Sequence, residues 1–488
     1  MNLSLSSICK ITGIVLMVIS VSMLPSILVC FIYKDGPEIY MPFIYTMVVT
    51  FILGLSLSKF FVVDNLKLKM REGFFIVSLC WIVACFAGSV PFMVTGTIPN
   101  MADAFFESCS GFSTTGSSIL SDIEALPMGI LFWRSFTHWV GGMGILVITI
   151  ALMPSLGIGG QNIAVSETPG PTLDKITPKM SDTAKTLFFL YILFTVLETI
   201  LLMFGGMNLF DALIHTFGTV GTGGFSNYNN SVAHFDSTYI KVVITAFMVL
   251  CGVNFNLLYY SVKRGAKVFR DDSEFKLYLF LYGVIAIFMF AVLFISKTIT
   301  SIGDAAVESA FQTASILTTT GFGSADYETW PMACQMAILL LMFMGGCSSS
   351  TSGGIKIVRI LVILKLIRRG VSTRLHPNVV ETIKLNGKTM PSDTVSAIAN
   401  HMFLYIVMIF VGAFIIAFEN VDLMTCFSSV ITCLGNIGPG FGLIGPTENF
   451  GGFSAISKYL LSFYMLAGRL ELYTLFILLT PKFWNPDH

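Results

Sequence analysis

Hydrophobic positions dominate this chain in long runs that are separated by shorter polar or glycine-rich segments. Ten of these runs are long enough to be membrane spans, because a helix needs about 20 mainly apolar residues to cross a bilayer. The runs cover residues 9–33, 40–62, 73–95, 129–153, 184–206, 238–262, 276–297, 333–364, 397–418 and 455–480, and the eighth is interrupted. The pattern predicts ten membrane-spanning helices.

Composition supports this interpretation. Of the 488 residues, 55% are hydrophobic and only 11% are charged, whereas a soluble domain carries roughly 25% charged residues. The formal net charge is +0, so only the placement of charge is informative. The chain is therefore predicted to be an all-α polytopic membrane protein.

Four further segments are too short to cross a bilayer, and each lies between two predicted spans. Each begins at an aspartate and ends at a glycine-containing turn that also carries Thr or Asn. The segments are Asp103–Gly116, Asp211–Gly224, Asp304–Gly321 and Asp422–Gly438. They are predicted to be half-length pore helices, with the four aspartates as N-caps.

The order of span, short helix, glycine turn and span therefore occurs four times, after two extra spans. This predicts four pseudo-symmetric repeats around one pore. The predicted divisions are 1–70 for the two extra helices, then 71–160, 161–270, 271–390 and 391–488 for repeats one to four.

Basic residues indicate the orientation. Segments 59–71, 154–186, 263–276 and 356–388 hold 20 of the 28 Lys and Arg residues. The turns after the short helices (117–128, 225–237, 322–332 and 439–453) hold none. By the positive-inside rule the basic loops and both termini are cytoplasmic, and the glycine turns face outside.

Four such turns on one side of the membrane have a clear chemical use. A dehydrated monovalent cation needs several oxygen dipoles at once, and four loops around an axis can supply a ring of backbone carbonyls. Glycine permits the unusual φ and ψ angles that aim those carbonyls inward. The alternative is that Gly and Thr only pack between membrane helices, but four equivalent occurrences favour an ion selectivity filter.

Three stretches then carry a resemblance: SGFSTTG (Ser110–Gly116), TTTGFGSADY (Thr318–Tyr327) and LGNIGPGFG (Leu434–Gly442). With the two extra spans, they resemble the Trk/Ktr/HKT superfamily of K+ transporters, and most closely its TrkH/TrkG-type membrane subunits. The resemblance implies potassium uptake across the bacterial inner membrane, by symport or passive conduction. It also implies a homodimer, a cytosolic TrkA-type nucleotide-binding regulatory subunit, and K+ as the bound and transported ion, with no cofactor in this chain.

Carried over from this resemblance, the K+ filter has three residues in each turn. They are Thr114, Thr115 and Gly116; Thr222, Gly223 and Gly224; Thr319, Thr320 and Gly321; and Asn436, Ile437 and Gly438. None of the turns reads TVGYG. In some relatives a Ser at the position of Gly116 favours Na+, so Gly116 points to K+.

Two features are candidates for a gate. The eighth run is interrupted by Gly345, Gly346, Cys347, Ser348, Ser349, Ser350, Thr351, Ser352, Gly353 and Gly354. This stretch is either a loop or kinked contact, or, as the resemblance implies, an intramembrane loop that closes the pore. Arg469 lies deep in the last run, where it is either a structural partner of Glu471 or of a short-helix carboxylate, or a positive barrier below the filter.

Other polar residues and functions stay open. Glu107, His215 and Glu198 are expected to have bonded structural roles, and proton coupling through them is an open alternative. The absence of a catalytic constellation predicts a transport protein and not an enzyme. A Na+ or mixed-cation transporter and a small-solute secondary transporter are the alternative functions. The degree of K+ over Na+ selectivity and the nucleotide sensed by a partner are not predicted.

Overall fold

The structure is a computed structural model that describes residues 4–61, 70–144, 180–379 and 381–484. Within these residues the chain is almost entirely helical, as the apolar runs predict, and one small antiparallel hairpin pairs β1 (Lys384–Leu385) with β2 (Lys388–Thr389). The α-helices are α1 (Leu5–Ser22), α2 (Leu24–Tyr33), α3 (Pro37–Phe60), α4 (Met70–Val94), α5 (Met101–Phe112), α6 (Met128–Gly142), α9 (Met180–Phe204), α10 (Leu209–Val220), α11 (Thr238–Cys251), α12 (Phe255–Arg264), α13 (Lys267–Asp271), α14 (Ser273–Ile295), α15 (Ile302–Leu317), α16 (Met332–Leu341), α17 (Ile357–Leu375), α18 (Ser392–Ile416), α19 (Leu423–Gly435), α20 (Ala455–Arg469), α21 (Leu472–Leu479) and α22 (Pro481–Trp484). Short 3-10 helices are η2 (Ser231–His234), η3 (Tyr327–Thr329), η4 (Ala417–Glu419), η5 (Gly442–Ile444) and η6 (Phe450–Gly452).

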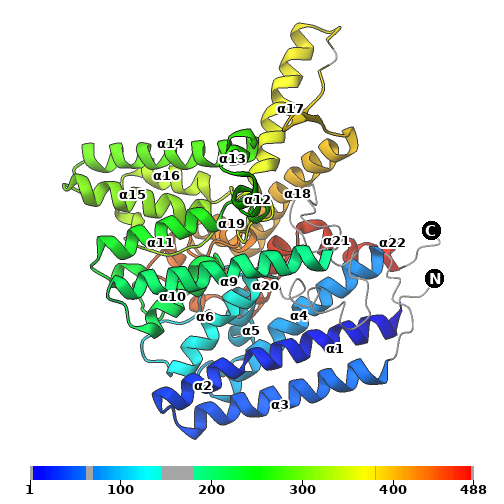
Figure 1. Cartoon of the computed structure of the whole chain (residues 1–488), viewed down its shortest axis with the longest axis vertical. Coiled ribbons are helices and arrows are strands. Elements are labelled where there is room, and N and C mark those ends of the chain that lie inside the picture. The colour runs from blue at the N-terminus through cyan, green and yellow to red at the C-terminus, as the bar shows by residue number, and fades with distance from the viewer. Residues whose placement is uncertain (1–3, 62–69, 145–179, 380, 485–488) are drawn as a thin grey trace.

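Six helices in the described part of the chain are long and apolar enough to cross a membrane. They are Leu5–Tyr33, Pro37–Phe60, Arg71–Val94, Ala184–Phe204, Ser273–Ile295 and Ser392–Glu419. These correspond to predicted spans one, two, three, five, seven and nine. Figure 1 shows them as long, roughly aligned helices around a set of shorter ones. The chain is a multi-pass membrane protein.

The other four predicted spans are the ones that follow the short helices, and the structure differs there. The run 238–262 is divided into α11 and α12, whose axes are bent by 92°. The run 455–480 is divided into α20 and α21. Of the run 129–153, only the part up to Gly144 lies within the described residues. The run 333–364, which was predicted to be interrupted, is divided into α16 and α17. The prediction of an unbroken span was therefore wrong for the runs 238–262 and 455–480.

Glycines near the ends of α6 and α20 allow these helices to pack closely against the short helices. A β-carbon at Gly141, near the end of α6, would overlap the carbonyl oxygen of Phe112, the last residue of α5. A β-carbon at Gly468 in α20 would likewise overlap the carbonyl of Leu434, near the end of α19. Glycine thus lets the ends of α6 and α20 press against the ends of the short helices. Backbone groups that lose their helical partners at a break find other hydrogen-bond partners. Between α11 and α12, the Gly252 carbonyl accepts a 2.8 Å hydrogen bond from the Cys347 amide.

The four short helices form as predicted, but most of their caps differ. Asn100, Asn208 and Ser301 are the N-caps of α5, α10 and α15, and only Asp422, the N-cap of α19, confirms the prediction. The other three aspartates (Asp103, Asp211 and Asp304) lie three residues further on, in the first turn of their helices. Negative charge in the first turn still complements the helix dipole. Asn, Ser and Asp are all good N-cap residues. The sequence pattern therefore did not distinguish the aspartate from the Asn or Ser that lies three residues before it.

The two extra N-terminal helices pack closely against each other. A β-carbon at Gly13 in α1 would lie 2.6 Å from the carbonyl oxygen of Gly54 in α3, and one at Gly54 would lie 2.6 Å from that of Gly13. Small residues allow this backbone approach, as is common between membrane helices.

Both ends of the described chain lie beside α4. The Ser4 amide donates to the Glu72 carboxylate at 2.9 Å, and the rings of Phe75 and Trp484 are 5.9 Å apart. The two ends of the described chain therefore lie near the same helix, and their location on the cytoplasmic side stays a prediction. Four of the basic residues in the loops used for orientation, Lys67, Lys69, Lys175 and Lys179, lie outside the described residues.

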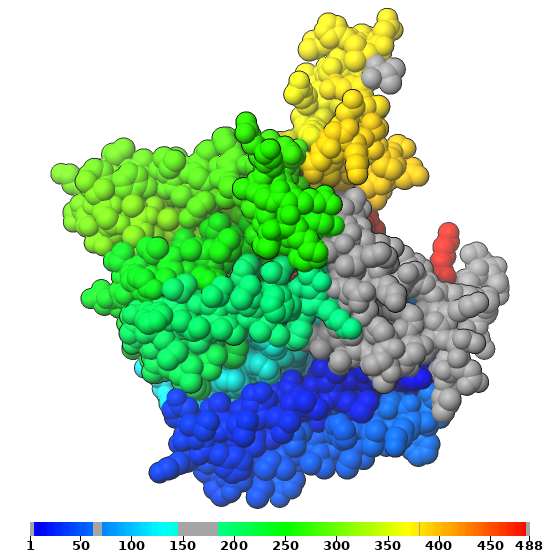
Figure 2. Space-filling view, in the orientation of Figure 1, coloured from blue at the N-terminus to red at the C-terminus, as the bar shows by residue number. Residues whose placement is uncertain are grey.

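The helix α17 projects from the rest of the molecule, together with the hairpin and the start of α18 (Figure 2). Arg368, Arg369 and Arg374 are exposed along it. The most basic predicted loop therefore forms a protruding arm.

Candidate functional site

The four predicted filter triplets share one backbone conformation. The first residue of each lies in the left-handed region, with φ between 53° and 57°, and the third is a glycine with φ between 78° and 106°. The first residues are Thr114, Thr222, Thr319 and Asn436. For a β-branched threonine this conformation is a genuine outlier, and such strain persists only where the surrounding structure imposes it, often at functional sites.

Hydrogen bonds from the helix ends impose this conformation. The amide of the second residue in each triplet donates to the carbonyl five residues earlier, at 2.7–2.9 Å, and the amide of the first donates three residues back, at 3.1–3.4 Å. Together these bonds form a Schellman motif at the end of each short helix. The turn amides are thus engaged by the helix ends, and the carbonyls of the second residues are free to face another partner.

Those carbonyls face the neighbouring turn. A β-carbon at Gly116 would overlap the Gly223 carbonyl oxygen, and one at Gly224 would overlap that of Thr320. A β-carbon at Gly321 would overlap the Ile437 carbonyl, and one at Gly438 would lie 2.7 Å from that of Thr115. The contacts run from the first turn to the second, third and fourth and back to the first. The structure thus brings all four triplets together in one closed ring, the four-turn ring.

Each glycine of the ring is therefore required for two reasons. Its φ is unfavourable for any residue with a side chain, and its neighbour leaves no space for a β-carbon. The C-terminal ends of the four short helices also meet at the ring, where their dipoles present partial negative charge. The arrangement is suited to a cation.

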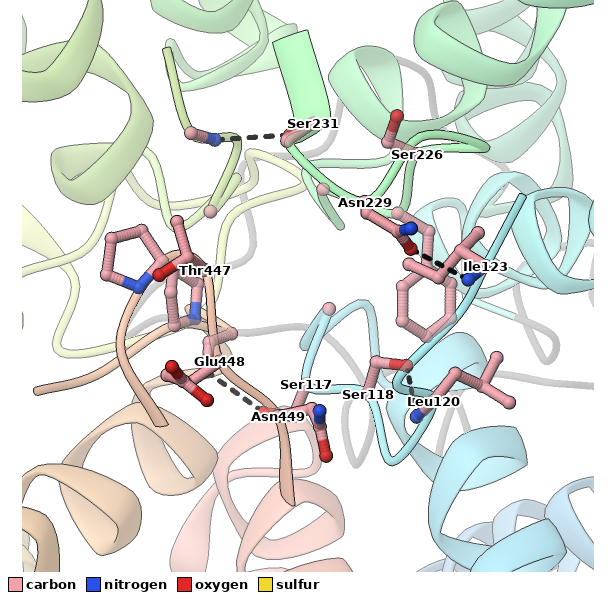
Figure 3. Close-up of a pocket in the computed structure, with 18 of the residues that line it drawn as sticks. Ser117, Ser118, Leu120, Ile123, Ser226, Asn229, Ser231, Thr447, Glu448 and Asn449 are labelled. Atoms are coloured by element: carbon pink, nitrogen blue, oxygen red, sulfur yellow. Dashed lines mark hydrogen bonds between the residues drawn. The ribbon is translucent and has the colours of Figure 1, made fainter. Parts of the chain in front are cut away.

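A cavity opens on one side of the ring. Gly116, Gly224, Gly321 and Gly438 line it, together with the residues that follow each turn. Figure 3 shows it as an open space surrounded by Ser117 and Ser118 from the first turn, Asn229 from the second, and Thr447 and Glu448 from the fourth. Hydroxyl, amide and carboxylate groups thus line this entrance.

The 345–354 loop lies on another side of the turns. The Gly353 amide donates to the Thr319 hydroxyl at 2.7 Å, and a β-carbon at Gly353 would lie 2.6 Å from the Gly435 carbonyl. The loop is well anchored at its other end, since both the amide and the hydroxyl of Ser348 donate to Glu274 at 2.6 Å. This loop is buried and makes direct contact with the third and fourth turns.

Arg469 joins this loop to the C-terminal end of α6. Its guanidinium donates to the Thr351 carbonyl at 2.7 Å and to the carbonyls of Gly141 and Gly142 at 2.7 and 2.9 Å. Glu471, its expected structural partner, forms an ion pair with Arg359. The Nη1 atom of Arg359 also lies 3.0 Å from Nε2 of His401. Arg469 thus donates to three backbone carbonyls from two separate segments of the chain.

Glu107 and His215, two polar residues of the short helices, are bonded, as predicted. Glu107 in α5 forms a buried ion pair with Arg134 at 2.5 Å. His215 in α10 bonds the Asp211 carbonyl at 2.8 Å and the Ser226 hydroxyl at 3.1 Å. Glu198 in α9 differs: it is fully buried beside Thr219, and no described residue gives its carboxylate a hydrogen bond of ordinary geometry.

Two residues at the site were missed by the sequence analysis. Arg134 is a cation within an otherwise apolar run, so the reasoning applied to Arg469 would have selected it. Glu274 lies at the start of an apolar run, next to polar residues, and no sequence signal relates it to the 345–354 loop, which is more than seventy residues away.

Comparisons with known proteins identify the family of this chain. The profile of the TrkH family, described as "Cation transport protein", matches residues 39–485. The Trk system potassium uptake protein TrkH of Vibrio parahaemolyticus is 37% identical, over 98% of this chain and 99% of that protein. The Escherichia coli proteins TrkH and TrkG are 36% and 33% identical, over 98% and 97% of this chain and 99% and 97% of their own lengths.

Solved structures include a close match. The crystal structure of the potassium transporter TrkH from Vibrio parahaemolyticus aligns with a TM-score of 0.88 at 36% identity, covering 98% of this chain and 99% of that one. These similarities confirm the predicted helical fold and the prediction of a transport protein and not an enzyme.

Proposed function

Because this chain belongs to the TrkH family of cation transport proteins, we propose that it takes up potassium across the bacterial inner membrane through the four-turn ring. The observation that carries the proposal is the closure of the ring, in which the second-residue carbonyl of each turn lies against the glycine of the turn before it. Four turns with one backbone conformation can supply the several carbonyl dipoles that replace the water around a monovalent cation. Relatives that align along nearly their whole length are named potassium uptake proteins.

In this proposal the twelve triplet residues are the filter, and K+ enters from the cavity lined by the ring glycines. The carboxylate of Glu448 and the hydroxyls around it raise the local cation concentration. Carbonyl oxygens carry only partial charge, so they bind the ion without trapping it. Gly116 favours K+, since it keeps the first turn in the same conformation as the other three.

The gate consists of the 345–354 loop and Arg469. The contact between Gly353 and Thr319 supports a loop that closes the path directly beneath the ring. Arg469 adds a positive charge that opposes cation passage. Because its guanidinium bonds the Thr351 carbonyl, movement of the loop and movement of this charge are coupled.

We infer the partners from the family and from the arm of α17. We place the basic arm, both termini and a nucleotide-binding TrkA-type subunit on the cytoplasmic side, with two copies of this chain in the assembly. The exposed Arg368, Arg369 and Arg374 support a cytoplasmic location by the positive-inside rule.

The test is ion-selective uptake in cells that lack their own K+ uptake systems. Expression of this chain should restore growth at low external K+, and purified protein in liposomes should carry K+ faster than Na+. Rescue of Na+-dependent growth with equal Na+ and K+ flux would favour the mixed-cation alternative. Flux of a small solute without any K+ flux would contradict the proposal.

A further inference from the structure

Arg134 lies behind the first two turns of the ring. It belongs to α6, its side chain is 2% exposed, and it borders the cavity above the ring. Its Nε donates to Glu107 Oε1 at 2.5 Å, and its Nη1 donates to the Ser226 carbonyl at 2.9 Å. One guanidinium therefore contacts a carboxylate of the first repeat and the backbone of the second.

Glu107 extends this contact to the first turn. Its Oε1 accepts a hydrogen bond from the Ser118 hydroxyl, and its Oε2 accepts one from the Ile119 amide, both at 3.0 Å. Ser118 lies two residues beyond Gly116, and Ser226 lies two residues beyond Gly224. The pair of Arg134 and Glu107 thus connects equivalent positions on neighbouring turns, both at the entrance shown in Figure 3.

The connection is rigid. Both partners are almost completely buried, so their attraction is weakly screened. The guanidinium also lies 3.7 Å from the ring centre of Phe225, which fixes its plane. A planar group with donors in a fixed fork can hold two acceptors at a set distance, whereas the single ammonium of a lysine cannot.

Other ion pairs at the short helices are built differently. Lys458 pairs with Asp103 at 2.6 Å, in the first turn of α5 and at the opposite end from the filter triplet. Lys241 pairs with Glu308 at 2.6 Å, and both of these side chains are more exposed than Arg134 and Glu107. The Lys458 pair therefore provides a control, because it contacts the start of α5 and not the glycine turn that follows the end of α5.

From these contacts we infer that Arg134 is a positioning residue that sets the spacing between the first and second turns and thereby the ion selectivity of the ring. The inference rests on the proposed function, because it assumes that the ring is the filter. If the spacing relaxes, the carbonyl dipoles of Thr115 and Gly223 are no longer held at the separation that suits K+.

The experiment compares Arg134→Lys with Lys458→Met in liposomes, measuring K+ and Na+ flux together with the melting temperature. Arg134→Lys keeps the charge opposite Glu107 but loses the fork, so the ratio of K+ to Na+ flux should fall several-fold while the protein remains folded. Lys458→Met should lower the melting temperature and leave the ratio unchanged. An unchanged ratio of K+ to Na+ flux in folded Arg134→Lys would overturn the inference. An equal fall of this ratio in Arg134→Lys and Lys458→Met would overturn it too.

A second variant applies if Arg134→Lys does not fold. Ser118→Ala removes one of the two contacts between Glu107 and the first turn, and should lower the ratio by a smaller factor; an unchanged ratio there would overturn the inference too. Gly116→Ser distinguishes a failure of this inference from a failure of the proposed filter. If Gly116→Ser changes the ratio and the Arg134 and Ser118 variants do not, only the inference fails; if none of them changes it, the proposed filter fails.

Discussion

The amide of Gly353 and the hydroxyl of Thr319 are 2.7 Å apart. This hydrogen bond joins the 345–354 loop to a residue of the third turn that itself holds a left-handed backbone conformation. The loop and the ring are therefore in direct contact, and a displacement of one affects the position of the other.

The first prediction concerns Gly116 and the ring. Gly116→Ser should reduce the preference for K+, because serine disfavours a φ of 82° and its β-carbon would overlap the Gly223 carbonyl. The measurement is the ratio of K+ to Na+ flux in liposomes. Gly96→Ser is the matched control, since Gly96 has a φ of 73° but no atom near an added β-carbon. Equal ratios in both variants and the parent would argue against Gly116 as a filter residue.

The second prediction concerns the 345–354 loop. Removing Cys347–Ser350 should raise basal K+ flux and weaken control by the regulatory subunit, because the shortened loop can no longer span the space beneath the ring. Glu274→Gln keeps the loop length but weakens the two bonds that hold Ser348, so it should raise flux by less. The gating role fails if folded deletion protein conducts no more than the parent.

The third prediction concerns the charge of Arg469. Arg469→Ala should raise cation flux, since two charges 4 Å apart at an effective dielectric constant of about 20 repel by about 4 kcal/mol. Arg469→Lys retains the charge and should keep flux low. Flux per folded protein and melting temperature are measured together.

A structural role for Arg469 predicts another outcome. Its loss would leave the carbonyls of Thr351, Gly141 and Gly142 without this donor, at about 1–3 kcal/mol for each buried group left unsatisfied. A destabilised Arg469→Ala protein without higher flux would assign Arg469 to that role.

The fourth prediction concerns the N-cap of α19. Asp422 accepts a 3.0 Å hydrogen bond from the Thr425 amide, and its bonds from Thr425 hold the pKa of its carboxyl below the ordinary value. Asp422→Ala should therefore lower the free energy of unfolding by about 1 kcal/mol, whereas Asp422→Asn, which keeps a capping oxygen, should lower it by less.

The same lowered pKa gives a pH dependence. Ionised Asp422 contributes stability above the ordinary carboxyl pKa, and this contribution is lost as the pH falls through the lowered value. Melting curves of the parent should therefore lose more stability in acid than those of Asp422→Asn. Parallel curves for the two proteins would contradict the assignment of this pKa to the cap.

Sequence reasoning located the four glycine turns more reliably than the helix boundaries around them. A glycine with its preceding Thr or Asn marks a turn whatever surrounds it, so all four triplets were placed in register. The N-cap depends on which of two capable residues takes the position, and Asn100 takes it in place of Asp103. The breaks between α11 and α12 and between α20 and α21 fall at Gly252–Asn254 and at Leu470–Glu471, inside runs that are otherwise apolar, so run length alone did not reveal them.

The sequence by itself determined that this is a helical membrane protein with four short helices and four glycine turns, since bilayer thickness and glycine geometry act locally along the chain. Only the tertiary structure decided how distant segments meet. Three relationships join residues that are far apart in sequence: each turn faces the next, Gly353 contacts Thr319, and Arg134 reaches the Ser226 carbonyl beside the second turn. Such contacts depend on how whole helices pack, which no local pattern of hydrophobic and polar residues encodes.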